Sequence, residues 1–411
     1  MQRPKVRFKG FTDDWEQRKF GELVEKYEDI VDTPTEGYTR LGIRSHAKGT
    51  FHSYVEKGKE LETAKMFRVA ANNFIVNITF GWEHAVAITD ENDAGKLVSH
   101  RFPQYSFNEG KLPEFFKYLI LDERFRHHLE LSSPGGAGRN RVLKLNDMLD
   151  YKMSFPRTAE QEKVGMYFSH LDYIITFHQR KCEQTKKLKK YMLQKMFPKE
   201  GQTVPEIRFE GFTDAWEKRK LLGCIKKITD FRGRTPKKLG MDWSENGYLA
   251  LSALNVKNGY IDFNQDVHYG NQELYDRWMS GNELHKGQVL FTTEAPMGNV
   301  AQVPDNNKYI LSQRTIAFDV KSEIISEDFL ATILRTPNVI NDLIALASGG
   351  TAKGVSQKSL SALTIKIPSN IAEQSKIAEY FQNLDLLITL HQRKCDELQN
   401  IKKFMLQNMF I

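Results

Sequence analysis

AEQEKVGMYFSHLDYIITFHQRKCEQTKKLKKYMLQKMF, residues 159–197, returns 213 residues later as AEQSKIAEYFQNLDLLITLHQRKCDELQNIKKFMLQNMF, residues 372–410. In both copies, apolar and small side chains recur at alternating spacings of four and three, which is the heptad pattern of a coiled-coil seam. The seam positions are Val164, Phe168, Leu171, Ile175, His178, Cys182 and Thr185 in the first copy, and Ile377, Phe381, Leu384, Ile388, His391, Cys395 and Leu398 in the second. Only Gly165 interrupts either copy, so each predicts a helix of about 60 Å at 1.5 Å per residue. We expect the two helices to lie antiparallel and to bury their seams against each other.

Bulk composition limits the class of protein. The chain has 411 residues, 40% of them hydrophobic, which allows two or more domains with ordinary cores. Its 59 lysines and arginines exceed the 52 acids, so an anionic partner is expected. The three cysteines have no disulfide-framework spacing, and the chain shows neither a signal-peptide core nor an apolar run long enough to span a bilayer. We therefore expect a cytoplasmic protein with no membrane partner.

The segment before each globular part is also duplicated. PKVRFKGFTDDWEQRK, residues 4–19, returns as PEIRFEGFTDAWEKRK, residues 205–220. Each copy has an aspartate three residues before a glutamate, which predicts a helix start, and a tryptophan that is expected to pack into a core. These residues are Asp13, Glu16 and Trp15 in the first copy, and Asp214, Glu217 and Trp216 in the second.

The interiors of the two globular parts match more loosely, block by block. Residues 37–51 and 247–261 each read as a strand followed by a loop and a hairpin. Residues 112–131 and 327–346 each predict an amphipathic helix that leads into a glycine pair with basic neighbours. A short apolar strand then runs to Pro156 in the first half and to Pro368 in the second.

These patterns predict an α+β protein with a twofold internal repeat. We expect two mixed α/β globular domains, residues 1–157 and 199–368, separated by two long antiparallel coiled-coil helices, residues 158–198 and 369–411. Only two repeats are present, which argues against a solenoid. The helices are nearly the same in both copies whereas the globular interiors have diverged, so one scaffold carries two domains for two ligands of one class.

Motifs for catalysis are lacking. GGTAKG is too short for a phosphate-binding loop, no GxGxxG follows a strand, and no Asn-Pro-Pro-aromatic tetrapeptide of an amino-methyltransferase occurs. His178 with Cys182, and His391 with Cys395, would supply a two-His, two-Cys zinc site if the two copies met. The favoured interpretation is that these residues fill a polar layer of the helix pair, so no bound metal is expected.

Basic residues gather in loops of both globular parts, and they are our candidates for binding DNA. Glycine allows backbone N–H groups to approach a phosphate, and arginine beside it can reach a guanine edge with two hydrogen bonds. Recurrence of glycine with basic residues at the same point of both halves favours this interpretation over a solvated loop. The candidates are Arg40, Arg44, His46, Lys48, Arg139 and Arg141 in the first half, and Arg232, Arg234, Lys237, Lys238, Asn255, Lys257, Lys353 and Lys358 in the second.

The duplicated PEIRFEGFTDAWEKRK-like segment, the two AEQ…HQRKC…MF helices and the alternation of diverged domains with similar helices resemble the specificity subunits of type I restriction-modification enzymes. The resemblance covers essentially the whole chain. It implies two target recognition domains, residues 1–157 and 199–368, each reading one half of a split double-stranded DNA site. The helices would then fix the gap between the halves.

The resemblance further implies that catalysis belongs to partners. Two modification subunits would dock on the helices and methylate adenine N6 with S-adenosylmethionine, and restriction subunits would add ATP- and Mg²⁺-dependent translocation and cleavage. This chain itself would bind no cofactor. The alternatives are a stand-alone nuclease or methyltransferase with an unrecognised site, and a structural coiled-coil adaptor. The adaptor gives no reason for two diverged basic domains.

Overall fold

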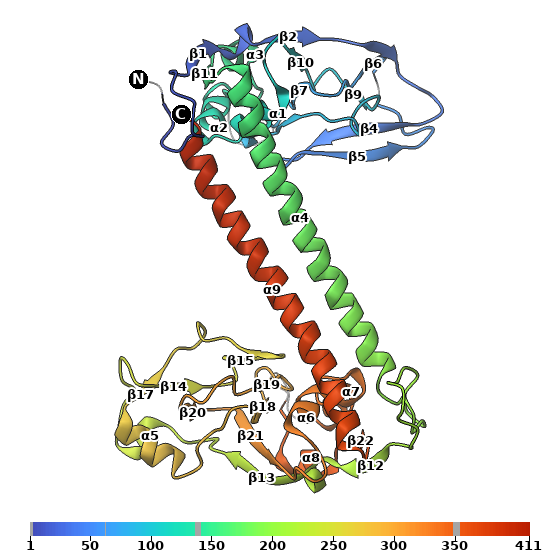
Figure 1. The fold of residues 1–411 in the computed structure, drawn as a ribbon. Coiled ribbons are helices and arrows are strands. Elements are labelled where there is room, and N and C mark those ends of the chain that lie inside the picture. Colours follow the sequence, from blue (N-terminus) through green and yellow to red (C-terminus); the bar gives the residue numbers. More distant parts are fainter. Residues whose placement is uncertain (1–2, 62, 136–140, 348–353) are drawn as a thin grey trace. The chain divides into compact units, whose positions relative to one another are not determined.

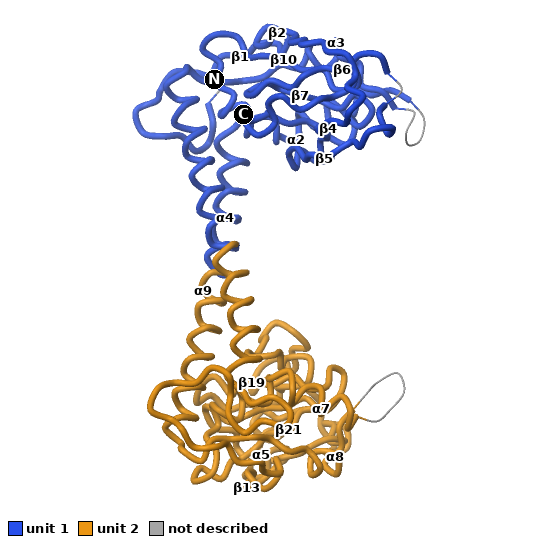
Figure 2. The backbone as a smooth tube through the Cα atoms, turned by 90° about the vertical axis from the view of Figure 1, so that its right-hand side faces the viewer, with its two compact units in different colours: residues 1–179, 393–411 blue, residues 180–392 orange. Residues whose placement is uncertain are grey.

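A computed structural model describes residues 3–61, 63–135, 141–347 and 354–411 of the chain. The chain divides into two compact units, coloured separately in Figure 2. Unit 1 comprises Met1–Gln179 and Arg393–Ile411, and unit 2 comprises Arg180–Gln392. Each unit is a mixed α/β body, and two long helices, α4 (Thr158–Lys195) and α9 (Ile371–Met409), contribute a segment to each of them (Figure 1).

The described residues of the globular part of unit 1 form three sheets, with strand orders β1-β11, β2-β10-β7-β8 and β3-β6-β9-β4-β5. Helices α1 and α2 pack on the core of the four-stranded sheet through Phe116 and Phe125. Its elements are β1 (Glu16–Lys19), β2 (Val24–Tyr27), β3 (Ile30–Asp32), β4 (Tyr38–Ile43), β5 (Thr50–Val55), β6 (Lys65–Arg68), β7 (Phe74–Val76), β8 (Val86–Ile88), β9 (Leu97–Val98), β10 (Gln104–Phe107), α1 (Pro113–Leu119), α2 (Glu123–Leu131), α3 (Leu145–Leu149) and β11 (Lys152–Phe155). Short 3₁₀ turns occupy Phe20–Glu22 (η1) and Gly81–Glu83 (η2).

Unit 2 repeats this plan with different connections. Its sheets have strand orders β12-β22, β13-β21-β18-β19, β17-β14-β20 and β15-β16. Its elements are β12 (Glu217–Lys220), β13 (Ile225–Asp230), β14 (Tyr248–Leu251), β15 (Val256–Lys257), β16 (Tyr260–Ile261), β17 (Tyr269–Gly270), α5 (Gln272–Met279), β18 (Val289–Thr292), β19 (Val300–Gln302), β20 (Ile310–Leu311), β21 (Thr315–Val320), α6 (Glu327–Ile333), α7 (Pro337–Leu346), α8 (Gln357–Ala362) and β22 (Thr364–Ile367), with 3₁₀ turns at Leu221–Cys224 (η4) and Pro236–Leu239 (η5).

A pair of buried polar residues at the start of each long helix explains why the motif AEQ occurs twice. Glu160 of α4 accepts two hydrogen bonds of 2.7 Å from Arg7, and Glu373 of α9 accepts bonds of 2.7 and 2.8 Å from Arg208. The following glutamine, Gln161 or Gln374, donates to the carbonyl of the proline that ends the last strand. The motif therefore fastens the duplicated N-terminal segment and the last strand of each unit to its helix.

Within each unit, a segment of α4 packs antiparallel against a segment of α9. Lys402 pairs with Asp172 at 2.5 Å in unit 1, and its equivalent Lys189 pairs with Asp385 in unit 2. Seam residues are buried: Val164, Phe168, Leu171, Ile175 and Leu398 belong to the core of unit 1, and Ile377, Phe381 and Leu384 to that of unit 2. Cys182 and Cys395 are also buried, while His178, Ile388 and His391 are partly exposed. The first turns of each seam thus pack into a globular core as well as on the other helix.

Two predictions of local structure are wrong. The Asp13–Glu16 and Asp214–Glu217 pairs do not start helices, because Glu16–Lys19 and Glu217–Lys220 are strands paired with β11 and β22. Tertiary pairing overrides the local capping preference there. Each predicted amphipathic helix is two short helices: Asp122 accepts a hydrogen bond from the backbone of Arg124 and starts α2, and Pro337 starts α7.

The strand predictions are confirmed. Residues 37–51 form β4 and the start of the β4–β5 hairpin, and residues 247–261 form β14 followed by the β15–β16 hairpin. The strands before Pro156 and Pro368 are β11 and β22. In these places the short apolar runs and the turn glycines agree with the tertiary pairing, so local and global preferences give the same answer.

Candidate nucleic-acid interface

The loop between β4 and β5 is fastened to the loop at residues 79–84. The backbone N–H of His46 donates to the Glu83 carbonyl at 2.8 Å, and that of Ala47 donates to the His84 carbonyl at 2.8 Å. The Ser45 hydroxyl donates to the Glu83 carboxylate. His46, Ala47 and His84 all have left-handed backbone angles, with φ of 61°, 48° and 60°. Non-glycine residues adopt this conformation at a cost, so the surrounding bonds hold the loop in a defined shape with His46 and Lys48 exposed.

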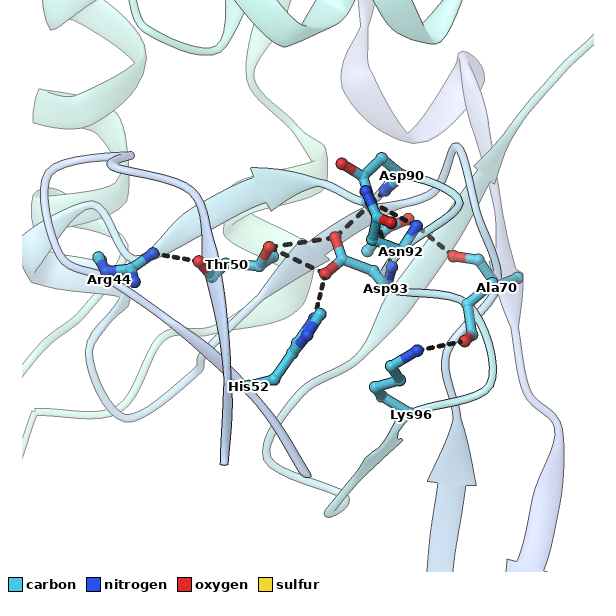
Figure 3. A network of polar contacts seen from close by, with 10 residues as sticks. Arg44, Thr50, His52, Ala70, Asp90, Asn92, Asp93 and Lys96 are labelled. Carbon is cyan, nitrogen blue, oxygen red and sulfur yellow. Dashed lines mark hydrogen bonds and ion pairs between the residues drawn. The ribbon is translucent and has the colours of Figure 1, made fainter. Parts of the chain in front are cut away.

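The hairpin itself is fixed to the core through a buried carboxylate, shown in Figure 3. Asp93 is almost fully buried and accepts hydrogen bonds from the Thr50 hydroxyl at 2.9 Å and from His52 Nε2 at 2.7 Å. At the tip, Arg44 donates to the Thr50 carbonyl and its guanidinium lies 5.3 Å from the centre of the Phe51 ring. The exposed Arg44 side chain is thereby oriented on a fixed aromatic surface.

The segment that follows the glycine-rich loop of unit 1, which begins at Arg141, also contacts the loop at residues 79–84. Leu143 N–H donates to the Ile78 carbonyl at 2.9 Å, and the Arg141 guanidinium lies 5.4 Å from the Trp82 ring. Arg141 also donates hydrogen bonds to the backbone carbonyls of Ser133 and Glu130, so part of its guanidinium is already bonded to the end of α2 and the residues after it. Arg139 lies outside the described residues. Two separate basic segments of the sequence, the β4–β5 loop and the segment that begins at Arg141, therefore meet around residues 79–84.

In unit 2 the corresponding segments also converge. Val355 N–H donates to the Thr293 carbonyl at 2.9 Å, which is the equivalent of the Leu143–Ile78 bond of unit 1. Gln357 of α8 donates to Asp230 at 3.1 Å, and Asp230 accepts a bidentate pair from Arg232. The segment that contains Lys358, which is exposed, thus lies beside the loop that carries Arg232. Lys353 lies outside the described residues.

The basic loop that carries Arg232 contains one acidic residue, the half-buried Asp230. Burial raises the pKa of Asp230, but hydrogen bonds from the side chain and backbone of Arg232 outweigh burial and hold that pKa below its ordinary value. Asp230 therefore stays ionised and orients Arg232. Arg234 is different, because its guanidinium packs 4.1 Å from the Phe231 ring centre and donates to the Trp278 carbonyl. Lys237 is exposed, and Lys238 donates to the Gly233 carbonyl at 2.7 Å.

One candidate contact residue is ruled out by burial. Asn255 is 0% exposed, and its side chain bonds to Ser252, Asp262 and Gln265 within its own loop. It organises the loop and is not available to a ligand. Lys257 is half-buried in β15. The turn of this hairpin at Gly259, with φ of 98°, approaches Arg335 so closely that a Cβ there would lie 2.7 Å from Nη1.

Sequence reasoning missed four residues beside these loops: Trp82, His100, Arg101 and Arg314. His100 and Arg101 line a pocket with Arg40, and Arg314 pairs with Glu294 at 3.2 Å next to Gly354. Trp82 stacks with Arg141, and its buried Nε1 has no hydrogen-bond partner among the described residues. None of these residues belongs to a basic cluster in the sequence, so only their convergence in the fold indicates a role.

The described residues show no grouping of three or more His, Cys, Asp or Glu side chains that could hold a metal ion. The thiols of Cys182 and Cys395 face backbone carbonyls, of Ile388 at 3.9 Å and Ile175 at 3.7 Å respectively. Over the described part of the chain, no helix is long and apolar enough to cross a membrane.

Each unit thus carries arginine and lysine side chains on loops that hydrogen bonds hold in place, through the backbone of His46 and Ala47 in unit 1 and through the side chains of Asp230 and Gln357 in unit 2. Arginine and lysine neutralise phosphates, and fixed loops with aromatic neighbours suit contacts to base edges. The two sets differ in position as well as in detail, since Arg44, His46 and Lys48 lie between β4 and β5 in unit 1, whereas in unit 2 Arg232 and Lys237 lie between β13 and β14 and Lys358 lies on α8. Such an arrangement can bind nucleic acid at two unlike places.

Comparison with known proteins agrees with this geometry. Residues 213–400 match the type I restriction modification DNA specificity domain. Over 410 residues the chain is 24% identical to the type I restriction enzyme MjaVIII specificity subunit of Methanocaldococcus jannaschii, covering 95% of this chain and 91% of that protein. The fold resembles the crystal structure of a type I restriction-modification system S subunit from M. genitalium with a TM-score of 0.62 and 12% identity, over 100% of this chain and 99% of that one. Residues 213–400 thus match a type I restriction modification DNA specificity domain, and over nearly its whole length the chain is similar to specificity subunits of type I restriction enzymes.

Proposed function

We propose that this chain recognises a bipartite, asymmetric site in double-stranded DNA, with unit 1 and unit 2 each reading one half. The observation that carries the proposal is that in each unit an exposed basic loop lies near the segment that follows the glycine-rich loop, and that this segment is held by equivalent backbone bonds, Leu143 to Ile78 and Val355 to Thr293, although the loop sequences have diverged. Equivalent placement suits one class of ligand, and divergence suits two different base sequences. The exposed basic residues provide phosphate contacts as well as base contacts.

Methylation and cleavage then belong to partner subunits. Both long helices expose apolar residues at the same four positions of the repeat, with exposed fractions between 37% and 68%. These positions are Tyr173, Phe177, Leu188 and Tyr191 on α4, and Leu386, Leu390, Ile401 and Phe404 on α9. They lie on the heptad positions away from the seam, and exposed apolar patches of this kind mark interaction sites. Two equivalent apolar faces fit two copies of one partner, which we take to be the modification subunit.

In this proposal the modification subunits use S-adenosylmethionine to methylate adenine N6, and restriction subunits use ATP and Mg²⁺ for translocation and cleavage. The chain itself directs these partners to the site. Sequencing of methylated adenines in the source cell would define the two half-sites. A duplex with both half-sites should then bind the complex far more tightly than a duplex with either half scrambled.

Binding to that duplex should also weaken steeply with salt, because each phosphate contact releases counterions. Affinity that does not change between low and high salt would contradict the proposal. The purified chain alone, given Mg²⁺ or S-adenosylmethionine, should neither cut nor methylate the duplex. Activity of the chain alone would instead favour the stand-alone enzyme.

A further inference from the structure

A pocket of about 640 Å³ opens on unit 1 between the β4–β5 hairpin and the loops at residues 77–83 and 99–102. Its walls combine three phenylalanines with basic and hydrogen-bonding side chains. The residues that matter here are Arg40, Phe51, Asn77, Glu83, His100 and Arg101. The pocket lies directly beside the loop contact between Ser45 and Glu83, and so adjoins the candidate nucleic-acid interface.

Gly42 lets the Phe51 ring, which forms one wall of the pocket, pack closely against β4. Phe51 is opposite Gly42 in the antiparallel pair of β4 and β5, and a Cβ on Gly42 would lie 2.3 Å from the Phe51 ring. The outer end of the ring therefore lies close to the backbone of β4 at Gly42, and a side chain at this position would displace the ring. Phe51 is nevertheless 40% exposed, so part of its surface is left for a ligand. Arg44 covers the same ring at 5.3 Å and adds a positive charge.

Polar groups around this aromatic surface are arranged for an anionic ring compound. Arg40 and Arg101 line the pocket. Among the described residues, the Arg101 side chain donates one hydrogen bond, a weak contact of 3.5 Å to the Thr79 hydroxyl. Glu83 accepts from Ser45 through Oε2, so Oε1 can accept a further hydrogen bond. Asn77 accepts from Thr79 N–H, and its amide nitrogen can donate. An exposed aromatic ring, donor and acceptor groups and two arginines together match a nucleobase with its phosphate.

We propose that this pocket binds a single nucleobase stacked on Phe51, with the attached phosphate held by Arg40 and Arg101. The proposal rests on the proposed function, since a base unstacked from the duplex is one source of this ligand and a free nucleotide is the other. Unit 2 has no matching set, because Ala250, Ser252, Leu254 and Ile261 stand at the positions of Arg40, Gly42, Arg44 and Phe51. The pocket therefore acts in one half-site only.

Two arms of one experiment separate the two sources. In the first, deoxynucleoside monophosphates are titrated into the full chain by calorimetry. In the second, the assembled complex binds target duplexes that carry 2-aminopurine at each position in turn, and its fluorescence reports unstacking. The test variants are Phe51→Ala and Gly42→Ala, which should weaken nucleotide binding about tenfold or more through lost stacking. Tyr54→Ala is the matched control, because Tyr54 is an exposed aromatic on the opposite face of β5.

A fluorescence rise at one position of one half-site, abolished by Phe51→Ala and kept by Tyr54→Ala, establishes an unstacked base as the ligand. Mononucleotide binding with the same variant pattern, without that rise, establishes a free nucleotide. Normal duplex affinity with neither signal overturns the pocket and leaves the proposed function intact. If the duplex is not bound at all, the proposed function fails, and the mononucleotide arm still decides on the pocket.

Discussion

Arg232 and Arg234 stand two residues apart in one basic loop, yet the structure gives them different roles. Arg232 is oriented by Asp230 with its guanidinium at the surface, whereas Arg234 stacks on Phe231 and bonds to the Trp278 carbonyl. The difference arises because a guanidinium can act either as a surface charge or as a packed donor. A run of basic residues in a sequence does not distinguish the two.

We expect Arg234→Ala to lower the free energy of unfolding by about 1.5–3 kcal/mol, because a charged hydrogen bond and a stacking contact are lost. Arg232→Ala should change stability by about 1 kcal/mol or less, since the Arg232 guanidinium lies at the surface and solvent weakens its ion pair. The same variant should weaken binding to one half-site by about 1–3 kcal/mol if Arg232 reads a base. Urea denaturation and duplex binding measure the two effects. Equal losses on every DNA sequence would show that Arg232 contacts phosphate only.

The buried His84 side chain makes the stability of unit 1 depend on pH. The ring is buried and its Nε2 lies 2.8 Å from the Ile120 carbonyl. Burial lowers the pKa of His84 below its ordinary value of 6.5, and the Ile120 carbonyl and Glu123 oppose this only in part. The unfolded chain therefore binds the proton at higher pH than the folded chain does, so acidification favours unfolding.

We expect the free energy of unfolding to fall as pH drops below about 6.5. His84→Gln keeps a donor toward Ile120 but does not titrate, so its stability should fall less steeply over the same range. The control is His127→Gln, because His127 is exposed. Urea denaturation at several pH values measures the slopes. A slope for His84→Gln equal to that of the unchanged chain would exclude His84 as the cause.

At the scale of elements, the start of each long helix depends on one buried ion pair. Glu373 accepts from Arg208 and also from Trp216 Nε1 at 3.2 Å, whereas in unit 1 Trp15 Nε1 has no partner among the described residues. Hydrogen bonding to Glu160 and Glu373 raises the pKa of Arg7 and Arg208, so both guanidinium groups remain charged. The two copies of this arrangement differ by one hydrogen bond.

We expect Glu160→Gln and Glu373→Gln each to lower the free energy of unfolding by about 3–5 kcal/mol, because each leaves a buried guanidinium without its counter-charge. The loss should be larger for Glu373→Gln, which also disturbs the bond from Trp216. Denaturation followed by tryptophan fluorescence measures both. Glu379→Gln, an exposed position on α9, is the control. A loss below about 1 kcal/mol in both variants would mean that the pair is not needed to hold the helix.

The exposed apolar positions of α4 and α9 make a separate prediction about assembly. Phe177→Asp and Leu390→Asp change equivalent positions of the repeat, in unit 1 and unit 2 respectively. We expect each single variant to bind one modification subunit and the double variant to bind none, since a charge in an apolar contact is costly. Mass measurement of the purified complex gives the stoichiometry. Gln399→Asp, on an exposed position of α9 outside this set, should keep both, and two subunits bound to the double variant would refute the assignment.

At the scale of the whole molecule, both long helices run from one unit into the other as continuous elements. The ion pairs Asp172–Lys402 and Lys189–Asp385 each lie inside one unit. An insertion between Gln179 and Arg180, matched by one between Gln392 and Arg393, therefore leaves both pairs in place. Seven residues keep the heptad register of the seam.

We expect such a double insertion to lengthen the unread gap of the target by about three base pairs, because seven residues add roughly 10.5 Å of helix and a base step is about 3.4 Å. Sequencing of methylated adenines in cells that carry the variant and its partners measures the gap. Insertion into α4 alone is the control, and it should abolish activity because the two helices no longer match. An unchanged gap in the double variant would show that the helices do not set the spacing.

The sequence by itself determined the duplication, the two long helices, the buried seam positions and the mixed α/β class. These features follow from periodicity and from strong local preferences, which a chain carries along its length. It also placed Arg44, His46, Lys48 and Arg232 on loops of the candidate interface.

The tertiary structure decided which polar residues are exposed on or beside these loops. Asn255 looks like a contact residue in the sequence and is buried in its own loop, while Trp82, Arg101 and Arg314 carry no sequence signal and lie beside the basic loops. It also turned two predicted helix starts into strands. The physical reason is that burial, hydrogen-bond partners and strand pairing depend on segments far apart in the chain, and local preferences contain no information about them.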